Sequence, residues 1–341
     1  MFIKRKFYSV VIALLLTVML VLSACAPSTS IDEESKAKET IEIKLAHSVA
    51  VGSHYDSVAN KFAELVKDKT DGRVNITIYP AGQLGAERQT VESLQVGTLD
   101  MTIVGSAGFA EKKLLIFNSP FLFRDIEHLR AVIHGDIGKE ISDSLEANTG
   151  VKIFEYFERL PFAISMVEPI NSMADWEGKK IRVQEDTMLM AYYRSLGASP
   201  EPMAFTEVYT AMRSKLLDGA WTLFDLQYDN KIYEVAKQVI ATGAELSPGY
   251  LMINTKTWDS LPSDVQVAMQ EARQELRTWN ENFVAEKVGE YMDKFDAAGV
   301  EVVFIEGEEQ QKYRDISKNV ALDNADLYGG RELYDKIKAA K

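Results

Sequence analysis

Arg182 is the side chain of this sequence best suited to bind a ligand. It lies in the segment WEGKKIRV (residues 176–183), where Ile181 and Val183 alternate with Lys180 and Arg182 as in a half-buried strand. A guanidinium is planar and keeps its proton, so it can hold a carboxylate through two parallel, charge-assisted hydrogen bonds. An arginine on the polar face of a strand is also a common solvated surface residue. The residue type therefore leaves both roles open.

The elements that follow Arg182 predict where its side chain lies. Helices are expected over residues 187–196 and 206–217, joined by a proline-containing loop over 197–205. The apolar run 220–224 then predicts a second buried strand. Ligands bind at the carboxyl ends of the strands in open α/β sheets. Arg182 is therefore expected at such a rim.

Several motifs, in order and at characteristic spacings, resemble the extracytoplasmic solute-binding proteins of TRAP (tripartite ATP-independent periplasmic) transporters, of the DctP type. The resemblance covers roughly residues 41–341. Around Arg182 it rests on GKKIRV (178–183), GASPEPMAFTEVYTAM (197–212) and DG (218–219). Elsewhere it rests on AHSVAVGSHY (46–55), YPAGQLGAERQTVESLQVGTLDM (79–101), SPFLF (119–123) and SPGYLMINTKTWDSLP (247–262).

The resemblance implies roles for Arg182 and for three residues that follow it in the chain. Arg182 would bind a ligand carboxylate, and Phe205 would cover the apolar part of the ligand. The family commonly has DGQEN where this chain has DGAWT, so Trp221 and Thr222 replace a Glu-Asn pair whose asparagine bonds the carboxylate. Thr222 keeps one hydrogen-bond donor. Trp221 either fills space beneath the pocket or closes one end of it.

Further candidates lie outside this region. A second polar residue of the family aligns with Phe162 by direct counting and with Arg159 after a small gap. Arg159 alternatively forms a salt bridge with Glu155 or Glu158. Glu87 either accepts hydrogen bonds from ligand hydroxyl or ammonium groups or stabilises the start of a helix. The remaining rim candidates, all at strand ends or helix starts, are His47, Tyr55, Gly105, Ser106, Asp225 and Tyr228.

Composition and motif content narrow the function further. The chain has 341 residues and a formal net charge of −13, which suits one large or two ordinary domains and disfavours nucleic acid as a partner. The four histidines show no metal-ligand spacing, and Walker, GxGxxG and GxSxG motifs are missing. We therefore expect no metal, no cofactor and no enzymatic activity. The alternative is an extracytoplasmic enzyme that uses the paired carboxylates Glu155 and Glu158.

The N-terminus predicts export and lipidation. Three basic residues (4–6) precede an apolar run (7–22), which ends in LSAC with Cys25, the only cysteine, in the position of a lipobox cysteine. Residues 1–24 are predicted to be a lipoprotein signal peptide and 25–40 a tether. A transmembrane anchor is the alternative, but the run is shorter than the roughly 20 residues of a span. The protein is therefore expected outside the cytoplasm, lipid-anchored to a membrane.

Strand and helix alternate from residue 41 onward, which predicts an α/β fold with mostly parallel sheets. An uninterrupted helix is expected over residues 263–297, about 50 Å long, with a helix pair broken near Gly289 as the alternative. The resemblance implies a two-lobe, periplasmic-binding-protein-like fold (type II-like) whose lobes this helix bridges. Other helices are expected over 86–95, 126–147 and 316–340, and strands over 41–45, 74–79, 99–104, 151–157 and 300–305. The expected lobes are 41–159 plus about 248–287, and 160–247 plus about 288–341.

The predicted function is capture of a small organic acid by hinge closure, followed by delivery to the membrane subunits of a TRAP permease. One arginine suits one carboxylate, whereas Glu87 and Asp225 would oppose a second charge. A monocarboxylate, such as a sugar acid or hydroxy acid, is therefore favoured over a dicarboxylate. A further alternative is the same fold acting as a ligand sensor for a signalling partner.

Overall fold

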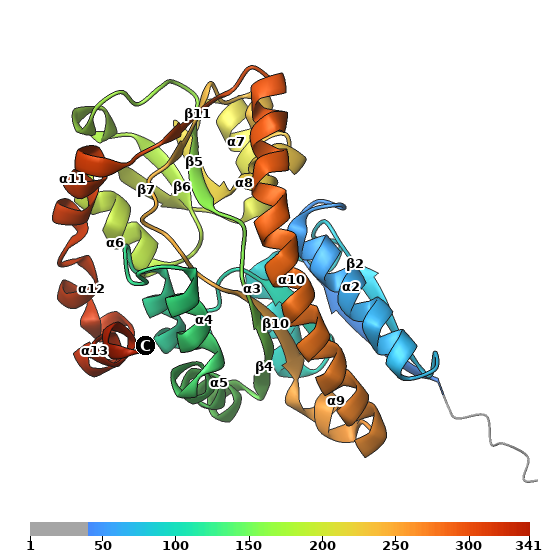
Figure 1. Ribbon diagram of the computed structural model, residues 1–341. Helices are drawn as coiled ribbons and strands as arrows, with labels where there is room; N and C mark the ends of the chain where they lie inside the picture. Colours follow the sequence, from blue (N-terminus) through green and yellow to red (C-terminus); the bar gives the residue numbers. More distant parts are fainter. Residues whose placement is uncertain (1–39) are drawn as a thin grey trace, which may run out of the picture. The chain divides into compact units, whose positions relative to one another are not determined.

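The computed structural model describes residues 40–341, so the predicted signal peptide, Cys25 and nearly all of the tether lie outside the described residues. The described part holds two β-sheets, of five and six strands, with helices packed around them (Figure 1). This agrees with the predicted α/β fold. Within residues 40–341, no helix is both long and apolar enough to span a bilayer.

The first sheet has the strand order β2-β1-β3-β10-β4. Strand β1 runs parallel to both β2 and β3, whereas β10 runs antiparallel to both β3 and β4. The strand bounds are Ile41–Ala46 for β1, Val74–Tyr79 for β2, Met101–Val104 for β3, Val151–Phe157 for β4 and Gly249–Asn254 for β10.

The second sheet has the order β11-β9-β5-β8-β6-β7. Strand β5 is antiparallel to β8 and β9, and the other pairings are parallel. The strand bounds are Phe162–Met166 for β5, Lys180–Val183 for β6, Ser199–Pro202 for β7, Gly219–Leu223 for β8, Gln238–Ala241 for β9 and Glu301–Phe304 for β11.

The two sheets are mostly parallel, as predicted, and each has one reversed strand among the described residues. The reversed strands, β5 and β10, are the first strands after the chain passes directly from one sheet to the other. A third passage, from β10 to β11, runs through helices and leaves β11 parallel to its neighbour β9.

The helices alternate with the strands through most of the chain. Local sequence sets several ends: Asp186 caps α6 by accepting from the main-chain N–H of Met188 and Leu189, and Gly97 ends α3 in the left-handed conformation. The α-helices are α2 (His54–Lys69), α3 (Glu87–Val96), α4 (Ile126–His134), α5 (Asp136–Thr149), α6 (Thr187–Ser195), α7 (Val208–Arg213), α8 (Phe224–Asp229), α9 (Thr255–Ser260), α10 (Ser263–Ala297), α11 (Gly307–Ser317), α12 (Val320–Asp323) and α13 (Arg331–Ala339). The short 3₁₀ helices are η1 (Lys112–Asn118), η2 (Met173–Trp176), η3 (Phe205–Glu207), η4 (Ile232–Glu234) and η5 (Ala325–Leu327).

The long helix α10 has the predicted bounds, and the alternative of a break near Gly289 is wrong. In Figure 1 it is the orange helix that runs alongside both sheets. It packs against α2, which follows the first strand of one sheet, and against α8, which follows β8 of the other. One continuous element therefore contacts both halves of the described chain.

Two predicted helices are wrong because glycines interrupt them. The predicted helix over 126–147 is two helices separated at Gly135, where an added Cβ would lie 2.5 Å from the carbonyl oxygen of Ala131. The predicted helix over 316–340 is broken before α13 by Gly329 and Gly330, with φ of 94° and 116°.

The region after Arg182 also differs from the prediction. The loop over 197–205 contains strand β7, which holds Pro200 and Pro202 and pairs only with β6 at the sheet edge. An edge strand tolerates prolines because it has one side free of ladder hydrogen bonds. The helix predicted over 206–217 is shorter: it ends at Arg213, and Lys215 is in the left-handed region.

Candidate functional site

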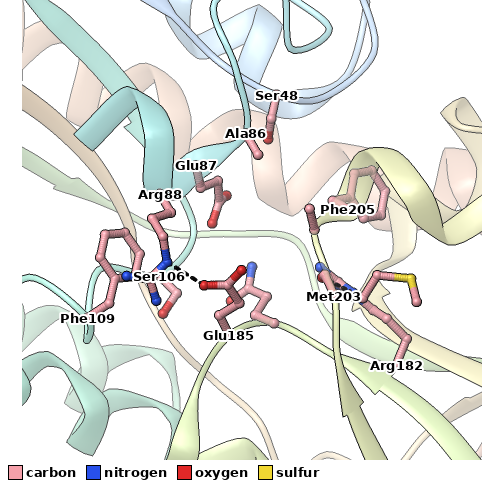
Figure 2. A pocket seen from close by; sticks show the side chains of 12 residues that line it. Ser48, Ala86, Glu87, Arg88, Ser106, Phe109, Arg182, Glu185, Met203 and Phe205 are labelled. Atoms are coloured by element: carbon pink, nitrogen blue, oxygen red, sulfur yellow. Dashed lines mark hydrogen bonds and ion pairs between the residues drawn. The ribbon is translucent and has the colours of Figure 1, made fainter. Parts of the chain in front are cut away.

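A cavity lies where strand ends from both sheets meet (Figure 2). From the first sheet's side it is lined by Ser48 after β1, Ser106 after β3 and Glu87 at the start of α3. From the second sheet's side it is lined by Arg182 on β6 and Phe205 after β7. The location agrees with the predicted rim at the carboxyl ends of strands.

A smaller cavity adjoins the first, and Glu87, Gln184 and Phe205 line both. Together the two cavities bring together eight of the twelve candidate residues named from the sequence, the eighth being Tyr55. The other seven are Glu87, Ser106, Arg159, Arg182, Phe205, Trp221 and Thr222.

Arg182 is buried, with 2 % of its surface exposed, so the alternative of a solvated surface residue is wrong. Its Nε donates to the carbonyl oxygen of Met203 at 3.0 Å, and its Nη1 donates to the carbonyl oxygen of Trp221 at 3.1 Å. Nη2 makes no hydrogen bond within residues 40–341. The main chain thus fixes the guanidinium plane and leaves one nitrogen available.

The charge of Arg182 has no ion-pair partner in the described chain. Burial lowers its pKa to about 10, although Glu87 and Glu185 act in the opposite direction. The side chain therefore still carries its charge at neutral pH. Its guanidinium carbon lies 5.5 Å from the centre of the Phe205 ring, and Figure 2 shows both side chains on one side of the cavity. This arrangement offers an anion a charged donor beside an apolar ring.

Arg159 is also buried and is held by neutral groups. Its Nε donates to the Ser247 carbonyl oxygen at 3.0 Å, Nη2 to the Ser247 hydroxyl at 2.6 Å and Nη1 to the Tyr55 hydroxyl at 3.2 Å. Its guanidinium carbon lies 4.5 Å from the centre of the Phe162 ring. Phe162, which aligns with the family's polar residue by direct counting, thus packs against Arg159. Both residues line the smaller cavity.

The expected alternative of a salt bridge from Arg159 to Glu155 or Glu158 is wrong. Glu155 accepts two hydrogen bonds from Arg277, at 2.9 and 3.0 Å, and Glu158 accepts one from Arg130 at 2.5 Å. Neither acid is among the residues that line the two cavities of the site. Their arrangement is that of structural ion pairs, so the geometry gives the paired-carboxylate hypothesis no support.

Glu87 opens helix α3, and Figure 2 shows its carboxylate pointing into the cavity. It accepts a hydrogen bond from the main-chain N–H of Gly105 at 2.8 Å. Burial raises the pKa of Glu87, and the Gly105 N–H together with the charges of Arg159 and Arg182 opposes that rise. A negative group therefore lies near both buried arginines of the site.

Trp221 combines the two roles that the sequence left open. It is fully buried and stacks on Phe162, with ring centres 4.5 Å apart and planes 6° apart. It also lines the smaller cavity together with Thr222. The indole thus fills space beside the cavity, while the main-chain carbonyl oxygen of Trp221 accepts the hydrogen bond from Arg182.

The lining of both cavities lacks four of the candidates, namely His47, Gly105, Asp225 and Tyr228. The Nε2 of His47 lies 3.1 Å from Oδ1 of Asp56, and both are buried. Asp225 is fully buried, and its Oδ2 accepts from the main-chain N–H of His54 at 3.0 Å. Each side chain therefore takes part in local packing at the start of α2.

Asp225 makes stability depend on pH. Burial raises its pKa from 3.8 to about 7, and nearby Asp229 adds to the rise. Between pH about 4 and about 7, the folded chain keeps a proton that the unfolded chain releases, so this group's contribution to stability falls as pH rises. Asp225→Asn, which resembles the protonated acid, is expected to gain at least about 1 kcal/mol relative to the natural protein between pH 5 and pH 8.

The measurement is urea denaturation of both proteins at the two pH values. The difference between the proteins isolates Asp225, because His54, whose pKa burial lowers to about 4, has the opposite pH dependence in both. A difference in unfolding free energy that stays constant from pH 5 to pH 8 would contradict the assignment.

Several lining residues were missed in the sequence. Gln184 stands two positions after Arg182, and the period of two along a strand was a signal that could have found it. Arg88, which follows the candidate Glu87 directly, also lines the cavity. It pairs with Glu185 at 2.5 Å and lies over the Phe109 ring, so it joins α3 to the segment after β6 across the cavity (Figure 2).

Comparison with known proteins agrees with the motifs and the geometry. Residues 45–325 match the family model described as bacterial extracellular solute-binding protein, family 7 (DctP). The 2,3-diketo-L-gulonate-binding periplasmic protein YiaO of Escherichia coli is 31 % identical over 72 % of this chain and 75 % of its own length. The C4-dicarboxylate-binding periplasmic protein DctP of Rhodobacter capsulatus is 29 % identical over 89 % and 91 %.

A solved structure agrees as well. It is a TRAP periplasmic solute-binding protein of Roseobacter denitrificans with bound L-galactonate, 27 % identical, with a TM-score of 0.82 over 89 % of this chain and 99 % of that one. Sequence motifs, family model and fold thus agree. The chain belongs to the bacterial extracellular solute-binding proteins of family 7, the DctP-type extracytoplasmic solute-binding proteins of TRAP transporters.

Proposed function

We propose that this solute-binding protein takes a small organic acid with one carboxylate, a sugar acid or a hydroxy acid, into the two adjoining cavities. The observation that carries the proposal is the buried charge of Arg182, which has an available nitrogen and no ion-pair partner among the described residues. A carboxylate that binds there gains charge-assisted hydrogen bonds in a site already shielded from water. Phe205 would cover the carbon chain of the ligand.

The balance of charges favours one carboxylate over two. The charged side chains that line the cavities are Arg159, Arg182 and Glu87, together with the pair of Arg88 and Glu185, which adds no net charge. One ligand carboxylate neutralises the remaining positive charge. A second would lie near Glu87, and desolvated like charges repel strongly.

The names of the relatives support both an acid with one carboxylate and the alternative of a dicarboxylate. L-galactonate and 2,3-diketo-L-gulonate are sugar acids with a single carboxylate. The Rhodobacter capsulatus relative binds C4-dicarboxylates, so a dicarboxylate is the second candidate.

A thermal-shift screen of a few hundred acids tests the proposal. Sugar acids and hydroxy acids are expected to raise the melting temperature, because a ligand in excess of its dissociation constant stabilises the folded state. The screen is run with and without calcium, since a metal ion could bridge the site's acids to a second carboxylate. Strong stabilisation by succinate, fumarate or malate in metal-free buffer, with none from sugar acids, would overturn the proposal.

We further propose that the two sheets are the cores of two lobes, 41–159 plus about 248–287 and 160–247 plus about 288–341. The sheet membership of the strands and the position of α10 along both sheets support this division. A ligand that contacts both lobes favours the closed state by its differential affinity. The closed protein would then release the acid, unchanged, to TRAP membrane subunits rather than signal to a sensor partner.

Lipid anchoring through Cys25 is part of the proposal and rests on the sequence of the N-terminus. Protein expressed with its own signal is expected to carry a diacylglyceryl group on Cys25, and Cys25→Ser is expected to release it from the membrane. Mass spectrometry of the mature N-terminus and fractionation of both forms check this. A freely secreted, unmodified chain would refute lipidation and leave the ligand proposal intact.

A further inference from the structure

The side-chain oxygen of Gln184 is a buried hydrogen-bond acceptor without a partner in the chain from residue 40 to 341. Gln184 lines both cavities, so it stands in the wall that they share. It follows β6 two positions after Arg182, and side chains two apart along a strand emerge on the same face. The site thus holds an unused acceptor next to its carboxylate-binding arginine.

The amide nitrogen of Gln184 lies close to Gly105, which directly follows β3. A Cβ added to Gly105 would lie 2.9 Å from Nε2 of Gln184, 2.6 Å from Nη1 of Arg159 and 2.6 Å from the Tyr55 hydroxyl. The absence of a side chain at Gly105 therefore lets these three groups converge. Packing on this side restricts how far the amide can turn.

One oxygen of Glu87, the other side-chain acceptor shared by the two cavities, is already in use. Glu87 accepts from the main-chain N–H of Gly105 at 2.8 Å, whereas the oxygen of Gln184 accepts from nothing in the described chain. A buried polar atom without a partner costs free energy, and a ligand that supplies a donor removes that cost. A site built in this way rejects an analogue that lacks the donor.

We propose that Gln184 determines specificity by accepting a hydrogen bond from a hydroxyl on one of the first carbons after the ligand carboxylate. Arg182 holds the carboxylate, so the hydroxyl that reaches Gln184 lies close to that end of the molecule. This inference rests on the proposed function and deepens it from an organic acid to an acid with a nearby hydroxyl.

Calorimetric titration of matched acids tests the role of Gln184. The probes are L-galactonate with its 2-deoxy and 3-deoxy forms, and lactate with propionate. The natural protein is expected to prefer the hydroxylated member of at least one pair by tenfold or more. Gln184→Met, which keeps the length of the side chain but accepts no such bond, should bring the two members within about twofold of each other.

Two further variants separate specificity from a structural role. Gln184→Glu keeps an acceptor and adds a charge, so both members of a pair should bind more weakly while their ratio is kept. Gln95→Met, at an exposed position on α3, should change no affinity. Thermal unfolding without ligand should show Gln184→Met at least as stable as the natural protein, because the unpaired oxygen is gone.

The outcomes that overturn the inference are also distinct. Equal binding of hydroxylated and deoxy acids by the natural protein, or an unchanged preference in Gln184→Met, refutes the role of Gln184. The proposed function then still stands if the same acids lose affinity in Arg182→Ala. Failure of the natural protein to bind either series also overturns the inference, and the wider acid screen decides the proposed function separately.

Discussion

Arg182→Ala is expected to weaken binding of an organic acid by about 2 to 5 kcal/mol, as when one partner of a buried, hydrogen-bonded charge pair is removed. The guanidinium is fixed by two main-chain oxygens, and the deleted group is a charged donor whose Nη2 is unused within residues 40–341. The ligand carboxylate would stay buried without its partner. Isothermal titration calorimetry with the strongest acid of the screen measures the loss.

Arg182→Lys is the matched control. It keeps the charge but cannot form the planar pair of hydrogen bonds, so it should bind more weakly than the natural protein and more tightly than the alanine variant. Because Arg182 has no ion-pair partner in the described part of the chain, neither variant should unfold the ligand-free protein. Unchanged affinity in a folded Arg182→Ala protein would show that the carboxylate binds elsewhere.

Trp221→Ala is expected to lower the free energy of unfolding by about 3 to 5 kcal/mol, the usual cost of truncating a fully buried large aromatic residue. The indole has no exposed surface and loses its stacking on Phe162. Trp221→Phe retains a ring and should lose less. Urea denaturation measures both variants.

Trp221→Ala should lower ligand affinity much less than it lowers the free energy of unfolding. Arg182 contacts the carbonyl oxygen of Trp221, which alanine also supplies, so protein that remains folded should bind its acid with much less than the loss expected for Arg182→Ala. A stability loss below about 0.5 kcal/mol would contradict the packing role, since substitutions at surface positions usually have effects of that size.

Sequence reasoning succeeded where the signal was local or repeated. The bounds of α10 followed from 35 residues without proline, and β4 and β2 followed from their apolar patterns. It failed where the outcome depends on three-dimensional contacts that residue patterns do not show. The break at Gly135 depends on the close approach of a carbonyl oxygen, and β7 forms because β6 accepts two prolines at its edge.

The sequence predicted that the site lies at the ends of strands, but it did not predict the hydrogen-bond partners of the site's side chains. The burial of Arg182 and its two acceptors depend on segments 21 and 39 residues further along the chain, which pattern analysis does not pair. Arg159 looked like a salt-bridge partner of its sequence neighbours, but Ser247, 88 residues away, holds it. Asp225 looked like a rim residue because it follows β8, yet its carboxylate meets the start of α2.

The way Arg182 is held has a consequence for how ligand preference diversifies. Its two acceptors are main-chain oxygens, those of Met203 and Trp221, which every amino acid provides. Mutations at these positions can therefore change the shape and polarity of the pocket wall without disorienting the guanidinium. A combinatorial library at positions 203 and 221, selected first for stability, should yield proteins that still require a carboxylate but differ in the rest of the acid that they accept.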